Sequence, residues 1–335
     1  MKLFKRKDDK KTEQEKVEER REEVLATGRK FKYPLQWTKH RVVINTILIA
    51  IVVLAIVVAG GWLALYKFNM TDEMLFRITK IVPVSVASVD GEDVRFSDYL
   101  MLYRSSILSI ERQSGQLGDG GSPEDLRNRY RRAALDEAES YVYAMKLAKE
   151  NDITVSNEEI TTEFNRHLKI GGTDRSEASF VKIIEDNFGL TKSEYERMLY
   201  LNLIKAKVQV EIDQNAANLA NRVEELINEK DGDYEKVAEA LDGEIQYEET
   251  GGMVSTHNLD GGRASEAINL EPGGQSGRFI SMNGDGYYFV KLVSKTDTKV
   301  NFVSIKVPFT EFQTRFDNLR AEDKIHEFIE IKSEV

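Results

Sequence analysis

The chain has 335 residues, contains no cysteine and carries a net charge of −10. This length is enough for two ordinary domains with additional segments, and the absence of cysteine excludes disulfides, thiolate nucleophiles and cysteine metal sites. The acidic total argues against nucleic acid as the main partner. The charge is uneven: residues 1–41 hold 14 basic and 8 acidic side chains, residues 42–66 hold none, and the remainder holds 33 basic and 49 acidic ones.

The uncharged apolar segment, residues 42–66, is the strongest signal in the chain. Its 25 residues can cross a hydrocarbon core, which needs about 20 helical residues. A cleaved signal peptide is the alternative, but the apolar run is too long and a 41-residue region precedes it. The basic flank places residues 1–41 in the cytoplasm under the positive-inside rule. We therefore expect a single-pass cell-membrane protein with a solvated cytoplasmic tail, partly helical or disordered, and extracytoplasmic C-terminal domains.

A hairpin followed by helices is predicted after the apolar segment. The hairpin covers residues 82–96, and its turn is Asp90-Gly91, a strong short-range hairpin signal. Ser97 begins one helix, and a second helix runs from Pro123 to about residue 151. A serine before the proline and acidic residues in the first turn are typical of a helix start.

Three further helices are predicted up to residue 210, each from a local start or stop signal. Ser156 with Glu159, and Thr191 with Glu194, have the spacing of capping boxes at helix starts. The helix between these two ends at Gly189, a residue type favoured at helix C-termini. The apolar spacing is amphipathic throughout, so this region is predicted to be almost entirely helical.

The pattern changes after residue 210. Two more helices are followed by pairs of glycines and by four β-type runs, "EIQYEE", "GRFISM", "YYFVKLV" and "VNFVSIKV". The adjacent residues Tyr287 and Tyr288 in the third run are predicted to point to opposite faces of a strand, one inward and one outward. A helix and a short strand close the chain. These features predict a compact α+β module with a small sheet.

Two groups of motifs follow the apolar segment in a fixed order. The first group contains "VASVDGEDVRFSDYLMLY" and "LAKENDITVSNEEI", and the second contains "DYEKVAEAL", "GGMVS" and "GDGYYFVKLV". The first group resembles the opening motifs of the helical chaperone domain in SurA/PrsA/PpiD-type extracytoplasmic foldases. The second group resembles a helix, a glycine turn and the closing strand of a parvulin-type peptidyl-prolyl isomerase domain. The resemblance covers roughly residues 82–300.

The composition and the resemblance together imply an α+β protein with one N-terminal transmembrane helix, a mainly helical SurA-N-like chaperone domain and a small parvulin-like α+β domain. Five regions are expected: a charged cytoplasmic tail at 1–41, a transmembrane helix at 42–66, the helical chaperone domain at 67–210, the parvulin-like domain at 211–299, and a strand-helix-strand segment at 300–335 that returns to the helical domain.

The resemblance also points to candidate site residues. In parvulins, two facing histidines anchor a polar network that favours the twisted amide, beside an apolar pocket for the proline ring. The second histidine position is Tyr288 here, which makes it the candidate catalytic residue. The first position falls at Val208 or Gln209 if "AKVQVEI" forms that strand, and at Ser304 if "VNFVSIKV" does. The candidate peptide-binding residues are Met253, Leu259, Phe279 and Tyr288.

The missing histidines predict weak or absent isomerase activity, and the sequence leaves open whether the protein is an enzyme. Neither a nucleotide motif nor a metal-binding histidine spacing is present, so no cofactor and no metal are expected. The leading hypothesis is a membrane-anchored extracytoplasmic foldase or chaperone whose helical domain offers an apolar cradle to unfolded or newly exported polypeptides. It is expected to bind neither nucleic acid nor nucleotide. One alternative is a non-catalytic envelope or secretion scaffold with a specific protein partner. Another is an active prolyl isomerase with a non-histidine network.

Overall fold

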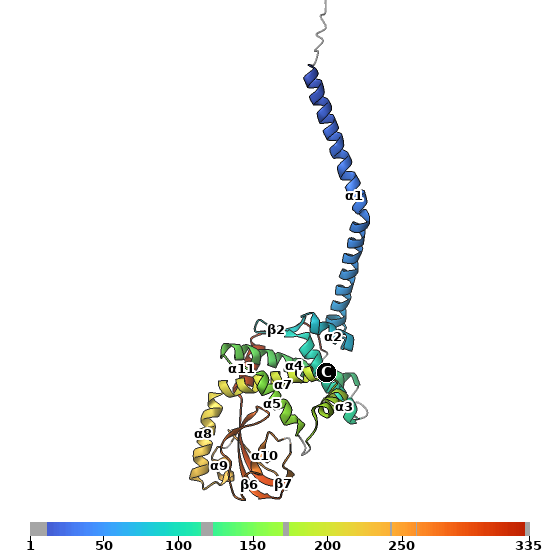
Figure 1. Cartoon of the computed structure of the whole chain (residues 1–335). Helices are drawn as coiled ribbons and strands as arrows, with labels where there is room; N and C mark the ends of the chain where they lie inside the picture. Colours follow the sequence, from blue (N-terminus) through green and yellow to red (C-terminus); the bar gives the residue numbers. More distant parts are fainter. Residues whose placement is uncertain (1–11, 115–122, 170–173, 242, 259, 332–335) are drawn as a thin grey trace, which may run out of the picture. The chain divides into compact units, whose positions relative to one another are not determined.

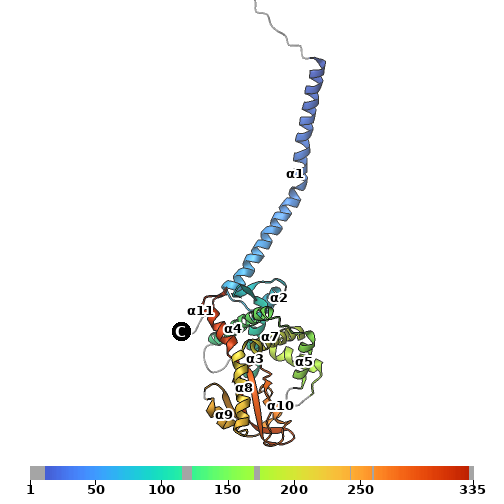
Figure 2. The same ribbon diagram turned by 90° about the vertical axis from the view of Figure 1, so that its left-hand side faces the viewer.

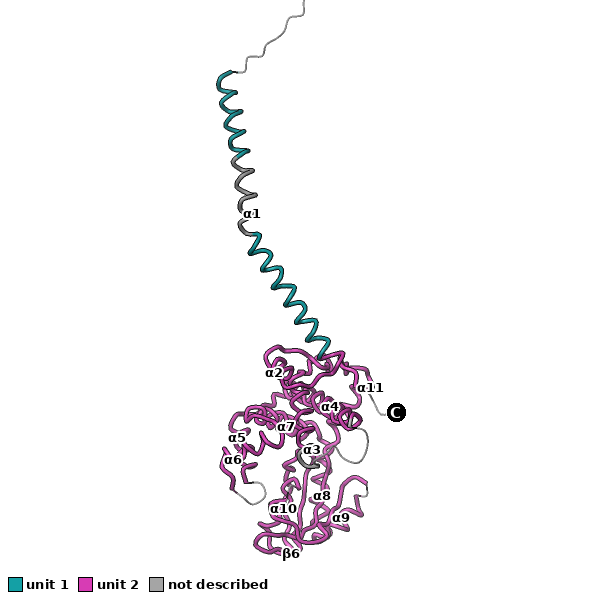
Figure 3. The backbone as a smooth tube through the Cα atoms, turned by 90° about the vertical axis from the view of Figure 1, so that its right-hand side faces the viewer, with its two compact units in different colours: residues 1–64 teal, residues 65–335 magenta. Residues whose placement is uncertain are grey.

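The computed structural model of the chain describes residues 12–114, 123–169, 174–241, 243–258 and 260–331 (Figure 1). The chain forms two compact units, residues 1–64 and residues 65–335 (Figure 3). The first unit contains helix α1, Glu13–Trp62, and a π-helical turn, Leu63–Lys67, continues from it. At the start of α1, the Glu15 carboxylate accepts a hydrogen bond from the Thr12 N–H at 3.0 Å.

One helical stretch among the described residues is long and apolar enough to cross a membrane. It covers Arg41–Lys67, which is 27 residues. At 1.5 Å per residue it is about 40 Å long, against roughly 30 Å for a hydrocarbon core. None of its most apolar part is buried within the protein, in contrast to the core helix of a soluble domain.

The helical part of the second unit packs around one hydrophobic core and carries a β-hairpin (Figure 1). Its helices are α2 Glu73–Ile81, α3 Phe96–Ser114, α4 Pro123–Glu150, α5 Asn157–Leu168, α6 Glu177–Phe188 and α7 Lys192–Ile212. The hairpin strands are β1 Ser85–Val89 and β2 Glu92–Arg95. Asp90 and Gly91 join them with φ angles of 48° and 86°. Two successive positive φ angles are the requirement of a type I′ turn, which explains the Asp-Gly pair.

The capping boxes predicted at Ser156 and Thr191 are present in the structure, whereas Ser122, the serine predicted to cap the helix from Pro123, lies outside the described residues. The Ser156 hydroxyl accepts a hydrogen bond from the Glu159 N–H at 3.2 Å, and the Thr191 hydroxyl accepts one from the Glu194 N–H at 3.4 Å. α6 ends at Gly189, whose φ is 65°. These local predictions are confirmed, and they fix where the helices of the core begin and end.

Five further strands form a separate antiparallel sheet, which with its helices is called the sheet module here (residues 214–308). Its strands are β3 Gln246–Glu249, β4 Val254–Ser255, β5 Phe279–Ile280, β6 Gly286–Lys295 and β7 Lys299–Pro308. Its helices are α8 Gln214–Glu229, α9 Tyr234–Ala240 and α10 Arg263–Ala267. The strand order is β3-β7-β6-β5, and β4 also pairs with β7.

Helices cover both faces of the sheet. Tyr287 and Phe289 pack against residues of α8 and α9, whereas Val290 and Leu292 pack against residues of α10. Figure 2 shows α8 and α9 on one side of the orange strands and α10 on the other. Consequently Tyr287 and Tyr288 are both buried, with 9% and 4% of their surface exposed. The prediction of one inward and one outward tyrosine is wrong, because the alternation places them on opposite faces that are both covered.

The C-terminal segment packs against the helical part rather than the sheet module. Its elements are α11, Glu311–Ala321, and β8, Ile325–Glu327. β8 pairs antiparallel with β1, so that Ala87 lies opposite Glu327. The rings of Phe312 and Phe316 lie 5.3 and 5.8 Å from the ring of Tyr143 in α4. Figure 2 shows the red helix α11 beside α4.

The segment "AKVQVEI" is helical. It forms the last turns of α7, so Val208 and Gln209 lie on a helix and not on a strand of the sheet. The apolar, β-branched composition of this segment suits a strand, but Val208 is fully buried in the helical core, and this packing overrides the local preference. β7 instead lies beside β6, and Ser304 is opposite Val290.

Candidate functional site

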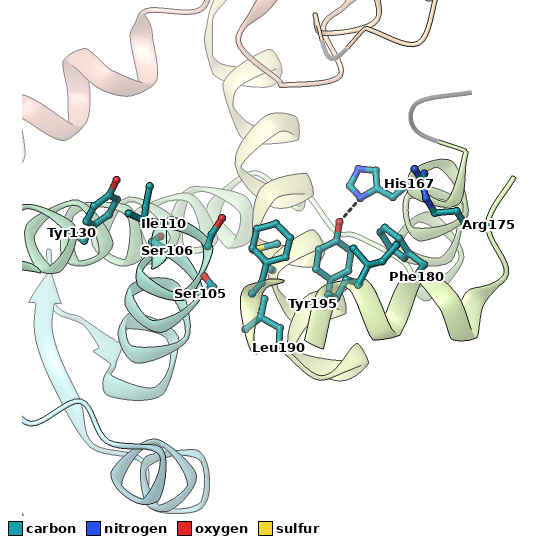
Figure 4. Close-up of a pocket in the computed structure, with 14 residues that line it drawn as sticks. Ser105, Ser106, Ile110, Tyr130, His167, Arg175, Phe180, Leu190 and Tyr195 are labelled. Atoms are coloured by element: carbon teal, nitrogen blue, oxygen red, sulfur yellow. Dashed lines mark hydrogen bonds between the residues drawn. The ribbon is translucent and has the colours of Figure 1, made fainter. Parts of the chain in front are cut away.

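An apolar pocket lies among helices α3 to α7 (Figure 4). It has a volume of about 700 Å³. Aromatic and aliphatic side chains make up most of its wall, and three serines, two tyrosines, a histidine and an arginine contribute polar groups. The lining residues are Ser105, Ser106, Ser109, Ile110, Tyr130, His167, Arg175, Phe180, Ile183, Ile184, Phe188, Leu190, Tyr195 and Met198.

A cluster of aromatic rings builds one wall of the pocket. Phe180 of α6 lies 5.5 Å from Phe164 of α5 and 5.7 Å from Tyr195 of α7, measured between ring centroids. Both pairs meet edge to face, an arrangement that the ring quadrupoles favour. Each ring comes from a different helix, so the cluster fixes the positions of α5, α6 and α7 relative to one another.

A hydrogen-bonded chain of polar groups borders this wall. The Tyr195 hydroxyl is 2.6 Å from His167 Nδ1 (Figure 4). His167 Nε2 is 3.2 Å from the Glu163 carboxylate. Burial raises the pKa of Tyr195 to about 12, so its phenol is neutral near pH 7. The ring of Tyr195 therefore presents an uncharged surface to the pocket, while its hydroxyl has a polar partner.

α6 supplies the most accessible part of the wall. Ser176 caps its start by accepting a hydrogen bond from the Ser179 N–H at 3.3 Å. Ile183 and Phe188 are 37% and 38% exposed, although both are large apolar side chains. Exposed apolar groups beside a buried aromatic wall suit the reversible binding of other apolar side chains.

Tyr288 lies elsewhere, in the sheet module, and its ring is enclosed. The Phe279 ring stacks on it at 6.0 Å, and the Arg263 guanidinium lies 5.2 Å from its centroid. The Lys306 ammonium group lies 5.8 Å from the same centroid and 2.6 Å from the Asp285 carboxylate. The Tyr288 hydroxyl donates a hydrogen bond to that carboxylate at 3.2 Å. Burial, together with the nearby Asp285 charge, raises the pKa of Tyr288. Side chains thus occupy the space around this tyrosine.

The other sequence-predicted residues are only partly brought together. Phe279 contacts Tyr288, whereas Met253 Sδ is 3.8 Å from the hydroxyl of Ser294, six residues further along β6. Six residues of a strand span about 20 Å. Leu259 lies outside the described residues. Ser304, at the first histidine position if β7 forms that strand, is buried and its hydroxyl is 3.3 Å from Arg263 Nη1.

The sequence predicts an apolar cradle in the helical domain, but none of the residues that line this pocket is among the sequence-predicted site residues. The amphipathic pattern of residues 177–188 predicts helix α6 but assigns its apolar residues to a filled core. A sequence signal for the pocket is the excess of apolar residues on the short helix α6. In the structure, Ile183 and Phe188 are the members of this excess that remain accessible.

The chain thus combines a helical domain that contains an apolar pocket with a helix long enough to cross a membrane. In a comparison with protein families, the family described as the SurA-like N-terminal domain matches residues 35–209, more than half of the chain, and this match supports a chaperone-type role. The chain therefore belongs to the family of proteins with a SurA-like N-terminal domain. A comparison with curated proteins found no match.

Proposed function

We propose that the protein is a membrane-anchored extracytoplasmic chaperone that binds unfolded or newly exported polypeptides in the pocket among α3 to α7. The observation that carries this proposal is the apolar pocket of about 700 Å³ within the SurA-like domain. Pockets of this size hold several side chains. Unfolded polypeptides expose such side chains, whereas folded proteins bury them.

The expected affinity follows from burial. Burying one leucine- or phenylalanine-sized side chain contributes about 1.5–3 kcal/mol. A few such side chains must offset the entropy lost when a flexible chain binds. The balance favours low to moderate affinity, which allows a client to dissociate without nucleotide hydrolysis.

The anchor is part of the same proposal. The stretch Arg41–Lys67 would cross the cell membrane, with residues 1–41 in the cytoplasm because of their basic excess. Residues 67–335 would then face exported chains on the other side. This arrangement would tether the pocket-bearing unit to the membrane from which the clients emerge.

We also propose that residues 211–299, which make up most of the sheet module, form a parvulin-like domain that binds peptides. Its isomerase activity would be weak or absent. The enclosure of Tyr288 by Phe279, Arg263 and Lys306 supports the low activity, because a proline ring needs an open apolar pocket. Met253, Phe279 and Leu259 remain the proposed peptide contacts, whereas the enclosed Tyr288 is no longer proposed as one. The C-terminal segment 300–335 would belong to both parts, with β7 in the sheet and α11 against the helices.

The chaperone function is tested by suppression of aggregation. The full chain in lipid nanodiscs is mixed with several unrelated unfolded proteins, and light scattering is measured. Wild-type protein should reduce scattering, and the double variant Ile183→Ser/Phe188→Ser should lose most of this effect. Val293→Ser, at an exposed valine of the sheet module, is the matched control and should retain it.

Two outcomes would contradict this proposal. Full activity of the double variant would show that clients do not use the pocket. A single stable partner in a pull-down, without any suppression of aggregation, would favour the scaffold.

Isomerase activity is tested separately by proline-limited refolding of a model substrate. No rate enhancement is expected from the wild-type chain. An enhancement that Tyr288→Phe abolishes would instead assign catalysis to the Tyr288 hydroxyl, because this substitution removes only that group.

A further inference from the structure

Helix α2 carries an apolar stripe on its outer side. Met74, Ile78 and Ile81 are 73%, 42% and 84% exposed. Their spacing of four and three residues places them on one side of the helix. Val82, directly after α2, is also exposed and extends the stripe. A helix on the surface of a water-soluble domain normally has polar residues on its outer side, so this stripe needs a nonpolar environment.

The opposite side of α2 is fixed to the helical part, so the stripe cannot turn inward. Phe76 and Thr79 are 5% and 3% exposed, and Phe76 belongs to the main core. The Lys80 ammonium group is 2.7 Å from the Glu194 carboxylate of α7. The Arg104 guanidinium of α3 lies 5.5 Å from the centre of the Phe76 ring.

The chain itself keeps α2 near the end of the candidate membrane span. That span ends at Lys67, and its last residues already belong to the folded second unit: Leu65 is buried in the core, and the Tyr66 hydroxyl donates a hydrogen bond to the Ser85 carbonyl at 2.7 Å. Met74 lies seven positions after Lys67 in the chain, which limits the distance between the two residues to about 25 Å. Phe68 and Met70, between these points, are exposed and apolar as well.

We propose that α2 lies in the lipid–water interface of the membrane crossed by residues 41–67, with Met74, Ile78 and Ile81 inserted among the lipids. Residues 67–82 contain three basic and two acidic side chains, in contrast to the acidic excess of the chain from residue 67 onward. This composition lowers repulsion from anionic headgroups. The helix would hold the second unit against the bilayer in a defined orientation. The inference rests on the proposed membrane anchor.

Because the chain contains no cysteine, a single introduced cysteine can be labelled at one chosen position. Single-cysteine variants of the full chain are labelled with a bimane dye and placed in nanodiscs of phosphatidylethanolamine and phosphatidylglycerol. Ile78→Cys and Ile81→Cys report on α2, Val52→Cys reports on the span, and Val293→Cys is the control at an exposed apolar position of the sheet module. Replacing part of the lipid with brominated lipid then quenches dyes that touch acyl chains.

The expected result is loss of fluorescence at positions 52, 78 and 81 and none at position 293. Quenching at 52 without quenching at 78 and 81 would overturn the inference and leave the anchor intact. No quenching at position 52 would overturn both proposals. Labels at 78 and 81 that resist aqueous iodide without being quenched by brominated lipid would show that protein, such as a second copy of the chain, covers the stripe, which also overturns the inference.

Discussion

Glu139 of α4 is completely buried, and its carboxylate links α4 to the C-terminal helix α11. Its carboxylate accepts a hydrogen bond from Arg320 of α11 at 3.1 Å, and its other oxygen has no hydrogen-bond partner among the described residues. Burial, reinforced by the charges of Glu327 and Asp136, raises the pKa of Glu139 to about 7, although Arg320 opposes this shift.

This raised pKa predicts a specific dependence of stability on pH. The folded state holds the Glu139 proton more tightly than the unfolded chain, in which the pKa is near 4.5. Between pH 4.5 and 7 the folded protein therefore binds more protons, and its free energy of unfolding falls as the pH rises through this window. A pKa of about 7 against 4.5 corresponds to about 3 kcal/mol of stability lost above pH 7.

Glu139→Gln removes this dependence, because glutamine keeps the size of the side chain and an oxygen for Arg320 but does not ionise. The free energy of unfolding of the variant minus that of the wild type should increase by about 3 kcal/mol from pH 4.5 to above pH 7. Urea unfolding of residues 65–335, followed by far-ultraviolet circular dichroism, measures it. Tryptophan fluorescence does not serve, since Trp37 and Trp62 both lie in α1.

The matched control is Asp136→Asn. Asp136 also accepts a hydrogen bond from Arg320, at 2.9 Å, but its side chain is 37% exposed. This control should lower the stability slightly and reduce the pH dependence only in part, because it removes one charge that raises the pKa of Glu139 but leaves Glu139 buried and ionisable. Parallel stability curves for Glu139→Gln and the wild type between pH 4.5 and 7 would refute the reasoning, because ionisation of Glu139 would then have no cost in the folded state.

Two further substitutions test contacts between segments distant in the sequence. Asp213 is buried after α7 and accepts a hydrogen bond from the Thr310 N–H at 2.7 Å; Asp213→Ala should cost about 3 kcal/mol and speed hydrogen exchange in α11, and unchanged exchange would contradict this. Gly284 has a φ of 68°, and a Cβ there would lie 2.6 Å from the Ala206 Cβ. Gly284→Ala should therefore cost about 1–3 kcal/mol in urea unfolding, whereas Gly277→Ala, with open space around it, should cost less.

Local signals in the sequence predicted most helices and the hairpin. Cap residues such as Ser156, the helix stop at Gly189 and the turn at Asp90 act on backbone groups within a few residues, so neighbouring side chains are enough to define them. The apolar segment that forms the candidate membrane span is equally local, because length and composition alone qualify it.

Long-range packing decided the rest of the fold. The pairing of β8 with β1 joins opposite ends of the second unit, and the hydrogen bond between Asp213 and Thr310 joins residues 97 positions apart. No periodicity in either segment encodes its partner. The segment "AKVQVEI" shows the same limit, since its β-branched residues suit a strand in isolation and the helical core makes it a helix.

The sequence by itself determined an apolar span, a set of amphipathic helices and a small sheet. Only the tertiary structure decided where their faces remain open. Ile183 and Phe188 line a pocket because the helices around α6 do not cover them, whereas Tyr288 is enclosed because α10 and charged neighbours cover its face of the sheet. The physical reason is that apolar periodicity gives the direction of a side chain relative to its own element, and burial depends on what other elements place against it.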